Sequence, residues 1–371
     1  MLRENLSLST NVQKISTNLN KSSLNAATGA IRKEQLCGQN VLQIKNRMRI
    51  ITLEEHFASP SWLDGAGRGT KELAKHPQNP LKEVPAKLID LGMQRLAEMD
   101  AAGIDMQVLS LNSPGVEQLD EAEAVPVARE TNDYLAAAVR AFPDRFGGFA
   151  ALPLARPEDA AKELERMVHD HGFKGAIING HVRERYLDDH FFWPALEAAE
   201  ALGVPVYLHP TQPPKAVTDI YFSGFSTEVD YIFSTVGWGW HIETAVHVVR
   251  MILGGVFDRL PRLQVIVGHM GEGLPFMLER MKATLAQRLT KVQRPVEAYL
   301  RENVYYTFAG FNYTATFLNL LMEVGVDRIM FSCDYPYGSM SKGRAFLDGL
   351  QVSDADREKI ASGNAVKLMG L

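Results

Sequence analysis

The chain has 371 residues, of which 46% are hydrophobic, and its 39 basic and 44 acidic residues leave a formal charge of −5. This size and apolar content allow one large packed core, and large α/β barrels fall near this length. A slightly acidic chain without a basic stripe gives no support for nucleic-acid binding. No stretch reaches about 18 uninterrupted apolar residues, so we expect no membrane span. The two cysteines, Cys37 and Cys333, cannot build a disulfide framework, and they favour a reducing, cytoplasmic location.

The first 47 residues differ from the rest of the chain. They contain no Phe, Trp or Tyr and are rich in Ser, Asn and Lys, so they bury too little apolar area to offset their ordering entropy. Few acids and several bases are a weak sign of a transit peptide. Alternatively, Met48, directly before the first β-rich run, is the original start. We expect residues 1–47 to be a dispensable or disordered extension and residues 48–371 to be one folded domain.

From Met48 onward, β-rich runs alternate with helical patterns. The runs lie at 49–53, 106–111, 146–152, 174–179, 204–209, 263–269, 303–308 and 328–334. The segments between them carry apolar residues at three- and four-residue spacing and often end in Gly, which is typical of amphipathic helices. Eight strands, each followed by a helix, predict an α/β fold of the (β/α)₈ or TIM-barrel type. The Gly- and Pro-rich stretch 59–85 is expected to be one long loop that covers an active site.

Residue types that bind metals gather at the ends of the predicted strands. In chain order these ends carry Glu54-Glu55-His56, His209, His269 with Glu272 three residues later, and Asp334. The carboxyl ends of the strands form the catalytic face of such a barrel, and alternation along a strand sends Glu54 and His56 to the same side. Taken singly, each histidine could be a hydrogen-bonded rim residue and the aspartate a helix cap. Together they predict a divalent cation that neutralises the carboxylates and binds the imidazoles.

The motifs resemble those of the amidohydrolase superfamily over nearly all of 48–371. More narrowly, "LEEHF", "YLHP", "GHMGEGLPF" and "DRIMFSCDYP" are similar to the metal-dependent aromatic acid decarboxylases. That group includes γ-resorcylate and 2,3-dihydroxybenzoate decarboxylase and is related to aminocarboxymuconate-semialdehyde decarboxylase. The resemblance implies an amidohydrolase-type barrel that removes carbon dioxide from a hydroxybenzoate-type acid without an organic cofactor.

The resemblance also implies roles for individual residues. Glu54, His56, His209 and Asp334 would hold one Zn²⁺ or Mn²⁺, and Asp334 would also act as general acid. The two-metal hydrolases of the superfamily commonly start with His-x-His and carry a modified lysine after the fourth strand. Here the first strand has Glu54-x-His56 and the fourth ends in Asn179, so a single metal is expected.

Further residues complete the expected site. His269 and Glu272 resemble the active-site pair of the family, with His269 facing the substrate, although Glu272 could instead be a first-turn acid favoured by the helix dipole. Arg280 falls where the family carries an arginine near the site, and a solvated helix charge is the alternative. The remaining candidates for substrate contact are Phe57, Asn179, His181 and Tyr337.

Two other functions use the same sequence features. A metal-dependent hydrolase of a lactone or amide in aromatic catabolism would need the same ligands, with metal-bound water as the nucleophile. A non-catalytic barrel that serves as a binding module is disfavoured, because its buried unpaired charges would bring only a cost. We expect a small aromatic acid as the substrate and a homo-oligomer, either a dimer or a tetramer, as the assembly.

Overall fold

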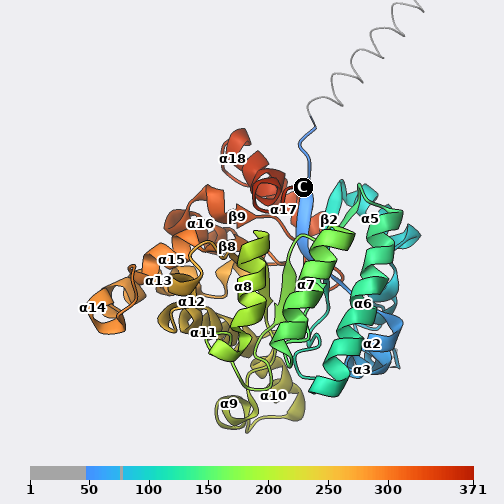
Figure 1. The fold of residues 1–371 in the computed structure, drawn as a ribbon. Helices are drawn as coiled ribbons and strands as arrows, with labels where there is room; N and C mark the ends of the chain where they lie inside the picture. Colours follow the sequence, from blue (N-terminus) through green and yellow to red (C-terminus); the bar gives the residue numbers. More distant parts are fainter. Residues whose placement is uncertain (1–46, 76–77) are drawn as a thin grey trace, which may run out of the picture. The chain divides into compact units, whose positions relative to one another are not determined.

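Parallel strands form a closed barrel in this computed structural model, which describes residues 47–75 and 78–371 (Figure 1). The predicted extension 1–47 lies almost entirely outside the described residues. The strands are β1 Ile51–Phe57, β2 Met106–Leu111, β3 Phe146–Gly148, β4 Ala150–Ala151, β5 Ala176–Asn179, β6 Val206–His209, β7 Val265–Val267, β8 Val304–Thr307 and β9 Ile329–Met330. The predicted (β/α)₈ class is confirmed, and residues 49–371 form one compact unit.

The barrel closes through two joints. The strands pair in the orders β1-β2-β3 and β4 to β9, because the third predicted strand divides at Phe149. Its amide donates to Leu109 of β2 over 2.9 Å, whereas the next amide, of Ala150, donates to Gly175 before β5 over 2.9 Å. At the other joint, Leu53 of β1 donates to the Phe331 carbonyl just after β9 over 3.2 Å. Strands that follow one another in the sequence therefore lie side by side around the whole barrel.

The strands are buried along their entire length. Val, Ile and Leu dominate their apolar positions, as expected where a parallel sheet is covered on both faces. Burying each such side chain contributes about 1.5–3 kcal/mol. Among the polar exceptions, Thr52 and Gln107 lie near the start of their strands, whereas the acids and histidines lie toward the carboxyl ends. The core therefore sits in and around the barrel, and the ionisable groups sit at its mouth.

Helices surround the barrel. The main ones are α5 Met93–Ala102, α6 Glu121–Ala141, α7 Pro157–His171, α8 Trp193–Leu202, α11 Gly239–Leu253, α13 Leu274–Thr284, α16 Thr314–Val324 and α17 Met340–Asp348. Shorter ones are α12 Val256–Arg259, α14 Gln287–Thr290, α15 Val296–Glu302, α18 Asp354–Glu358 and α19 Asn364–Met369. Helices α5, α7 and α8 end at a glycine with positive φ, which relieves the backbone strain of that cap. None of the helices among the described residues is long and apolar enough to cross a bilayer.

Three segments differ from the sequence prediction. The stretch 59–85 is not one loop, since it contains α2 Pro60–Asp64, α3 Arg68–Glu72 and α4 Val84–Ile89. Trp62 anchors it, because this side chain is fully buried and its Nε1 donates to the Gly115 carbonyl over 2.8 Å.

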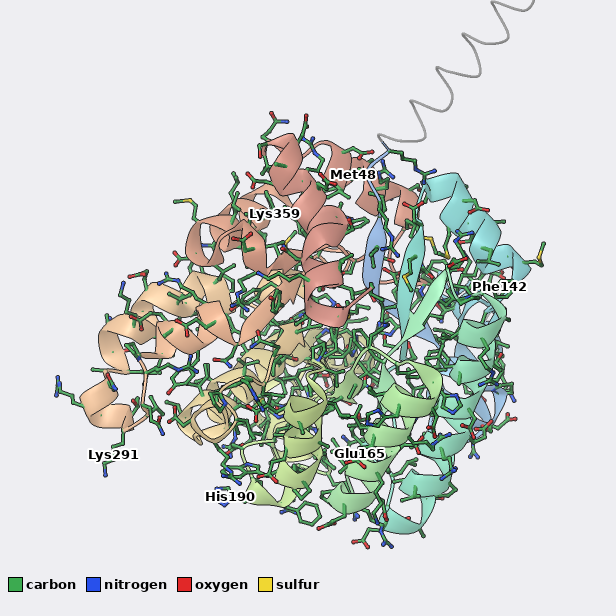
Figure 2. All side chains as sticks on the ribbon, turned by 45° about the horizontal axis from the view of Figure 1, so that its top comes forward. Met48, Phe142, Glu165, His190, Lys291 and Lys359 are labelled. Carbon is green, nitrogen blue, oxygen red and sulfur yellow. The ribbon has the colours of Figure 1, made fainter. Side chains whose placement is uncertain are left out.

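The helical segment expected after the run 263–269 divides into α13 and α14, and Figure 2 shows Lys291, just after α14, at the periphery of the molecule. After β6, two unpredicted helices, α9 Lys215–Tyr221 and α10 Thr227–Ser234, lie side by side at the lower end of Figure 1. Helix α9 buries no residue and α10 buries only Ser234, so the large apolar side chains of both helices are not part of the core.

Candidate metal centre and active site

The end of β1 is irregular at Glu54. The register with β2 shifts between Leu53 and Glu55, and Glu54 takes a φ of 63°. Such a β-bulge inserts an extra residue and re-aims a side chain. The side chains of Glu54 and His56 thereby share one side of the strand end, and their ligand atoms lie within 4.8 Å of each other and of His209. The predicted pairing of Glu54 with His56 is present, but a bulge and not regular alternation produces it.

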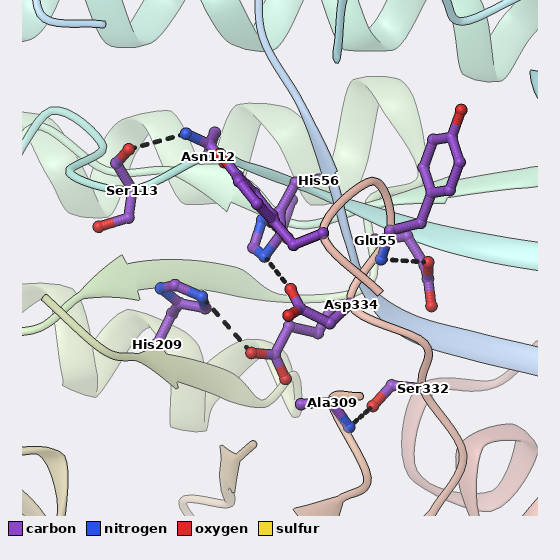
Figure 3. A network of polar contacts seen from close by, with 12 residues as sticks. Glu55, His56, Asn112, Ser113, His209, Ala309, Ser332 and Asp334 are labelled. Carbon is purple, nitrogen blue, oxygen red and sulfur yellow. Dashed lines mark hydrogen bonds and ion pairs between the residues drawn. The ribbon is translucent and has the colours of Figure 1, made fainter. Parts of the chain in front are cut away.

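Four side chains from three strand ends converge at the barrel mouth, namely Glu54, His56, His209 and Asp334. Figure 3 shows His56, His209 and Asp334 pointing toward one another. His56 Nε2 lies 3.2 Å from Asp334 Oδ1, and His209 Nε2 lies 3.4 Å from Glu54 Oε1. Ligand atoms that bind one tetrahedral cation at about 2.0–2.2 Å lie about 3.3–3.6 Å apart. The observed separations match that geometry, and they are longer than ordinary hydrogen bonds between charged groups.

An unpaired atom marks the centre of this cluster. Glu54 is fully buried, and its Oε1 has no hydrogen-bond partner among the described residues. A buried carboxylate oxygen without a partner is costly, and a cation between Oε1 and the imidazoles would remove that cost. Glu54, His56 and His209, whose ligand atoms all lie within 4.8 Å of one another, therefore fit one divalent cation and leave a fourth position for a further ligand. Asp334, which lies 3.2 Å from His56 Nε2, is next to that position.

Backbone and hydroxyl groups orient the two imidazoles. His209 Nδ1 donates to the Pro210 carbonyl over 2.8 Å, and His56 Nδ1 lies 3.3 Å from Ser110 Oγ. Each contact leaves Nε2 free to bind a metal, which is how outer partners commonly fix a histidine ligand. Burial lowers the pKa of His56 to about 3 and that of His209 well below its usual value. Both rings are therefore held neutral, as metal binding requires.

Glu55 points away from the cluster and holds the Asp334 segment in place. Its Oε1 accepts from the Cys333 amide over 2.8 Å, and its Oε2 accepts from the Tyr335 amide over 3.1 Å. Asp334 lies between those two amides with a φ of 61°, a conformation that needs such support. Burial raises the pKa of Asp334 to about 7. Glu55 thus has a structural role one residue away from a candidate ligand.

A second polar cluster adjoins the first and is centred on Glu272. His269 Nδ1 lies 2.7 Å from Glu272 Oε1, and His241 Nδ1 lies 2.6 Å from Glu272 Oε2. Glu272 precedes α13 and has a φ of 56°, so it is not the first-turn acid of the alternative interpretation. Burial alone would raise the pKa of Glu272, but His269 and His241 outweigh it and lower the pKa to about 2.

The clusters face each other across a short gap. His269 Nδ1 lies 3.8 Å from Glu54 Oε1, and the His209 and His269 rings are 6.3 Å apart. Burial alone would lower the pKa of His269, but Glu272 and Glu54 raise it to about 10. The structure therefore brings the predicted pair His269 and Glu272 together beside the four candidate ligands.

The candidate substrate residues differ in position. Tyr337 is 40% exposed, contacts the His56 ring edge-on at 5.9 Å and donates to Asn112 Oδ1 over 2.9 Å. Asn179 pairs in register with His209, and both polar atoms of its buried amide lack partners among the described residues. Phe57 is fully buried at the end of β1. Tyr337 and Asn179 thus border the cluster.

His181 and Arg280 are less directly placed. His181 Nε2 lies 3.1 Å from the Gln212 carbonyl and its Nδ1 accepts from the Glu184 amide over 3.1 Å, so backbone groups occupy both ring nitrogens. Arg280 is exposed on α13. Substrate contact by these two residues stays a prediction.

Comparison with known proteins identifies the family of the chain. Residues 86–371 match the family model described as Amidohydrolase. The chain belongs to this amidohydrolase family. It is 39% identical over 333 residues to a γ-resorcylate decarboxylase from Polaromonas sp. (strain JS666 / ATCC BAA-500), covering 86% of this chain and 98% of that protein.

Solved structures of two decarboxylases share the fold of this amidohydrolase. One is a dihydroxybenzoic acid decarboxylase from Polaromonas sp. JS666 with bound manganese and the inhibitor 2-nitroresorcinol, at 37% identity and a TM-score of 0.79 over 88% of this chain and 98% of that one. The other is 5-carboxyvanillate decarboxylase from Sphingomonas paucimobilis, at 33% identity and a TM-score of 0.80 over 88% of this chain and 100% of that one.

Sequence reasoning missed several residues of the amidohydrolase site. Tyr207 donates a hydrogen bond to Glu54 Oε2, and it lies two residues before His209, so strand alternation could have placed it on the same side. Asn112 follows β2 and accepts from Tyr337, but an amide is neither an acid nor a histidine, so its residue type alone does not mark it. No sequence signal connects His241 with Glu272, because their contact depends on how α11 packs.

Proposed function

We propose that this chain converts a hydroxybenzoate-type acid to the corresponding phenol and carbon dioxide at one divalent metal ion. It is a non-oxidative carboxy-lyase of the amidohydrolase superfamily. The observation that carries the proposal is the convergence of Glu54, His56, His209 and Asp334 at the barrel mouth, where the buried Glu54 Oε1 has no hydrogen-bond partner among the described residues.

The chain's own residues have separate tasks in this proposal. When bound, a divalent cation would hold the carboxylate and the ortho oxygen of the substrate and stabilise the charge that develops there. His269 uses Nδ1 for Glu272 and therefore has Nε2 available for the substrate. Tyr337, at the edge of the His56 ring, forms one wall of the substrate pocket.

Asp334 is the proposed general acid. Its carboxyl group gives a proton to the ring carbon that bears the carboxylate, and the ring loses aromaticity. The bond between that carbon and the carboxylate then breaks, its electron pair returns to the ring, and carbon dioxide leaves. The proton is recovered from water, so the net reaction consumes one proton and produces one carbon dioxide. A pKa of Asp334 raised by burial to about 7 supports this role.

The proposed metal is Zn²⁺ or Mn²⁺. Imidazole and carboxylate ligands accept both ions. Manganese in the structure of the Polaromonas dihydroxybenzoic acid decarboxylase supports the second choice. Metal analysis of the purified protein after loading with each ion, together with turnover rates, would decide between them.

The test of function is a panel of ortho-hydroxybenzoates incubated with metal-loaded protein in heavy water. We expect carbon dioxide release and one deuterium at the vacated ring position. Asp334→Asn should reduce the rate by at least about 10²-fold, also in molecules that retain metal, because an amide cannot deliver the acid proton. Turnover of a lactone or amide without loss of any carboxyl group would replace the proposal with the hydrolase alternative.

We also propose that the chain assembles as a homo-oligomer, either a dimer or a tetramer. Large apolar side chains are exposed on three consecutive helices near the barrel mouth, and we call this set the α9–α11 surface. It consists of Ile220, Tyr221, Phe225, Val229, Tyr231, Ile232, Val236, Trp238, Ile242 and Val246. Soluble monomers rarely expose so many neighbouring apolar groups, which supports a partner copy at this surface.

A further inference from the structure

Glu272 is held from both sides by imidazoles that come from different elements. His269 lies in the turn after β7, whereas His241 lies in the first turn of α11. Each ring uses Nδ1 for one carboxylate oxygen, at 2.7 Å and 2.6 Å respectively. Among the described residues, His241 thus connects a separate helix, α11, to the Glu272 carboxylate. That carboxylate in turn orients His269.

The Glu272 carboxylate determines that Nδ1 of His241 carries a proton. A carboxylate oxygen only accepts, so Nδ1, which lies 2.6 Å from Glu272 Oε2, must donate. The other ring nitrogen, Nε2, lies 3.1 Å from the Trp240 Nε1 donor and 3.2 Å from the Val236 carbonyl acceptor. The ring is also fixed in space, since it lies 4.7 Å from the His269 ring and 5.2 Å from the Phe311 ring.

The same three residues do not suit a second metal. Their nitrogen–oxygen separations of 2.6 and 2.7 Å are those of charge-assisted hydrogen bonds. Atoms that share a cation at about 2.0–2.2 Å lie about 3.3–3.6 Å apart, as in the Glu54 cluster. His241, Glu272 and His269 therefore form a hydrogen-bonded chain that ends beside Glu54, 3.8 Å from His269 Nδ1.

The backbone explains why Glu272 needs a second anchor. Glu272 has a φ of 56° and stands between Gly271 and Gly273, both also at positive φ. It lies outside α13, so no helical hydrogen bonds limit its movement. With His269 alone, the carboxylate could rotate about its side-chain bonds and carry the imidazole with it.

We infer that His241 is a positioning residue that locks the Glu272 carboxylate and thereby aims His269 at the substrate. This inference rests on the proposed decarboxylase function. His241 does not touch the reacting atoms. It acts on His269 through Glu272. Such outer partners of an active-site histidine are typically worth about 10- to 100-fold in activity.

Two substitutions separate this role from simple packing. In His241→Ala the Nδ1 donor is lost, and we expect kcat to fall about 10- to 100-fold with KM and the content of one metal per chain little changed. In His241→Asn the side-chain amide nitrogen takes the place of Nδ1 and should restore most of kcat. His247→Gln, on the same helix but away from Glu272, should keep kcat and serves as the control.

A double-mutant cycle gives the sharper measurement. In a Glu272→Gln background, His241→Ala should change kcat by less than about twofold, because the carboxylate through which it acts is gone. The inference is overturned if the two substitutions multiply independently, if Asn fails to rescue a folded, metal-loaded variant, or if wild-type protein binds two metals per chain.

Failure of the proposed decarboxylase function can be told apart from failure of the inference about His241. If the proposed function is wrong, wild-type protein releases no carbon dioxide from any hydroxybenzoate. In that case the hydrogen-bonded chain can still be tested by proton NMR of the metal-loaded protein, where Nδ1 protons in short bonds to a carboxylate resonate far downfield. We expect two such signals in wild type and the loss of one in His241→Ala, and an unchanged spectrum would contradict the inference.

Discussion

Tyr207 supports Glu54 from behind the candidate ligands. It is fully buried on β6, and its hydroxyl contacts Glu54 Oε2 and lies 2.7 Å from Thr307 Oγ1 of β8. Burial raises the pKa of Tyr207 well above its usual value, so the phenol stays neutral and donates. By occupying Oε2, it leaves Oε1 as the oxygen that faces His209. A ligand whose other oxygen is fixed in this way loses less freedom when metal binds.

Tyr207→Phe should therefore weaken metal binding by about 10- to 100-fold. The measurement is competition of metal-loaded protein with a chelator of known affinity. Tyr306→Phe is the matched control, because Tyr306 on β8 is equally buried but donates to the Leu300 carbonyl over 2.7 Å. Equal losses of affinity in the two variants would show that the effect is general loosening of the barrel and not support of Glu54.

At the scale of elements, α11 connects two parts of the barrel mouth. Its first turn places His241 against Glu272, and its middle places His247 against the segment after β5. His247 is buried, and its Nε2 accepts from the Leu187 amide over 2.9 Å. That bond requires an unprotonated Nε2, and burial lowers the pKa of His247 to about 3.

This histidine makes the fold sensitive to acid. Its pKa is lower in the folded chain than the ordinary 6.5, so the unfolded chain binds a proton first, and stability present above pH 6.5 is lost as the pH falls toward 3. At pH 5 the loss is about 2 kcal/mol. His247→Gln keeps an acceptor for Leu187 but cannot be protonated, so its free energy of unfolding should fall less between pH 7 and pH 5 in denaturant titrations.

The control for this prediction is His169→Gln on α7, because His169 is exposed. This variant should follow wild type at both pH values. If the His247 variant also follows wild type, the buried imidazole does not contribute to acid sensitivity.

The sequence predicts helices and strands well where buried residues recur periodically. It predicts them poorly where the packing of one element against another determines the structure. The strand-end residues Glu54, His209 and Asp334 could be found because parallel strands place their carboxyl ends on one face. The bulge at Glu54 could not be found in this way, since it is a shift in the register between β1 and β2 and the sequence carries no signal for that register. The segment 59–85 resembles a loop in the sequence because its helices are short, and α9 and α10 are hard to predict because they have only seven and eight residues.

At the scale of the whole molecule, closure of the barrel leaves no open strand edge in the part of the chain that the structure describes, so association is expected through helices. The α9–α11 surface suits a second copy. Between residues 220 and 242 the charged residues are Glu228 and Asp230, so the basic residues that favour an anionic membrane are absent from this stretch. Ten side chains, each exposing about 100 Å², would offer about 1,000 Å², compared with the roughly 800 Å² that each partner buries in a stable complex.

The last prediction concerns that assembly. Wild-type protein at micromolar concentration should have the mass of a dimer or tetramer in light scattering. The double substitution Ile220→Glu and Tyr221→Glu should lower that mass, because it places four carboxylates across the two-fold axis of a dimer built on α9. Met93→Glu on α5 is the control, since Met93 is 82% exposed but lies outside the α9–α11 surface, and it should keep the wild-type mass. A monomeric wild type, or a double variant that keeps the wild-type mass, would contradict the assignment of this surface, and metal content would show whether the site survives dissociation.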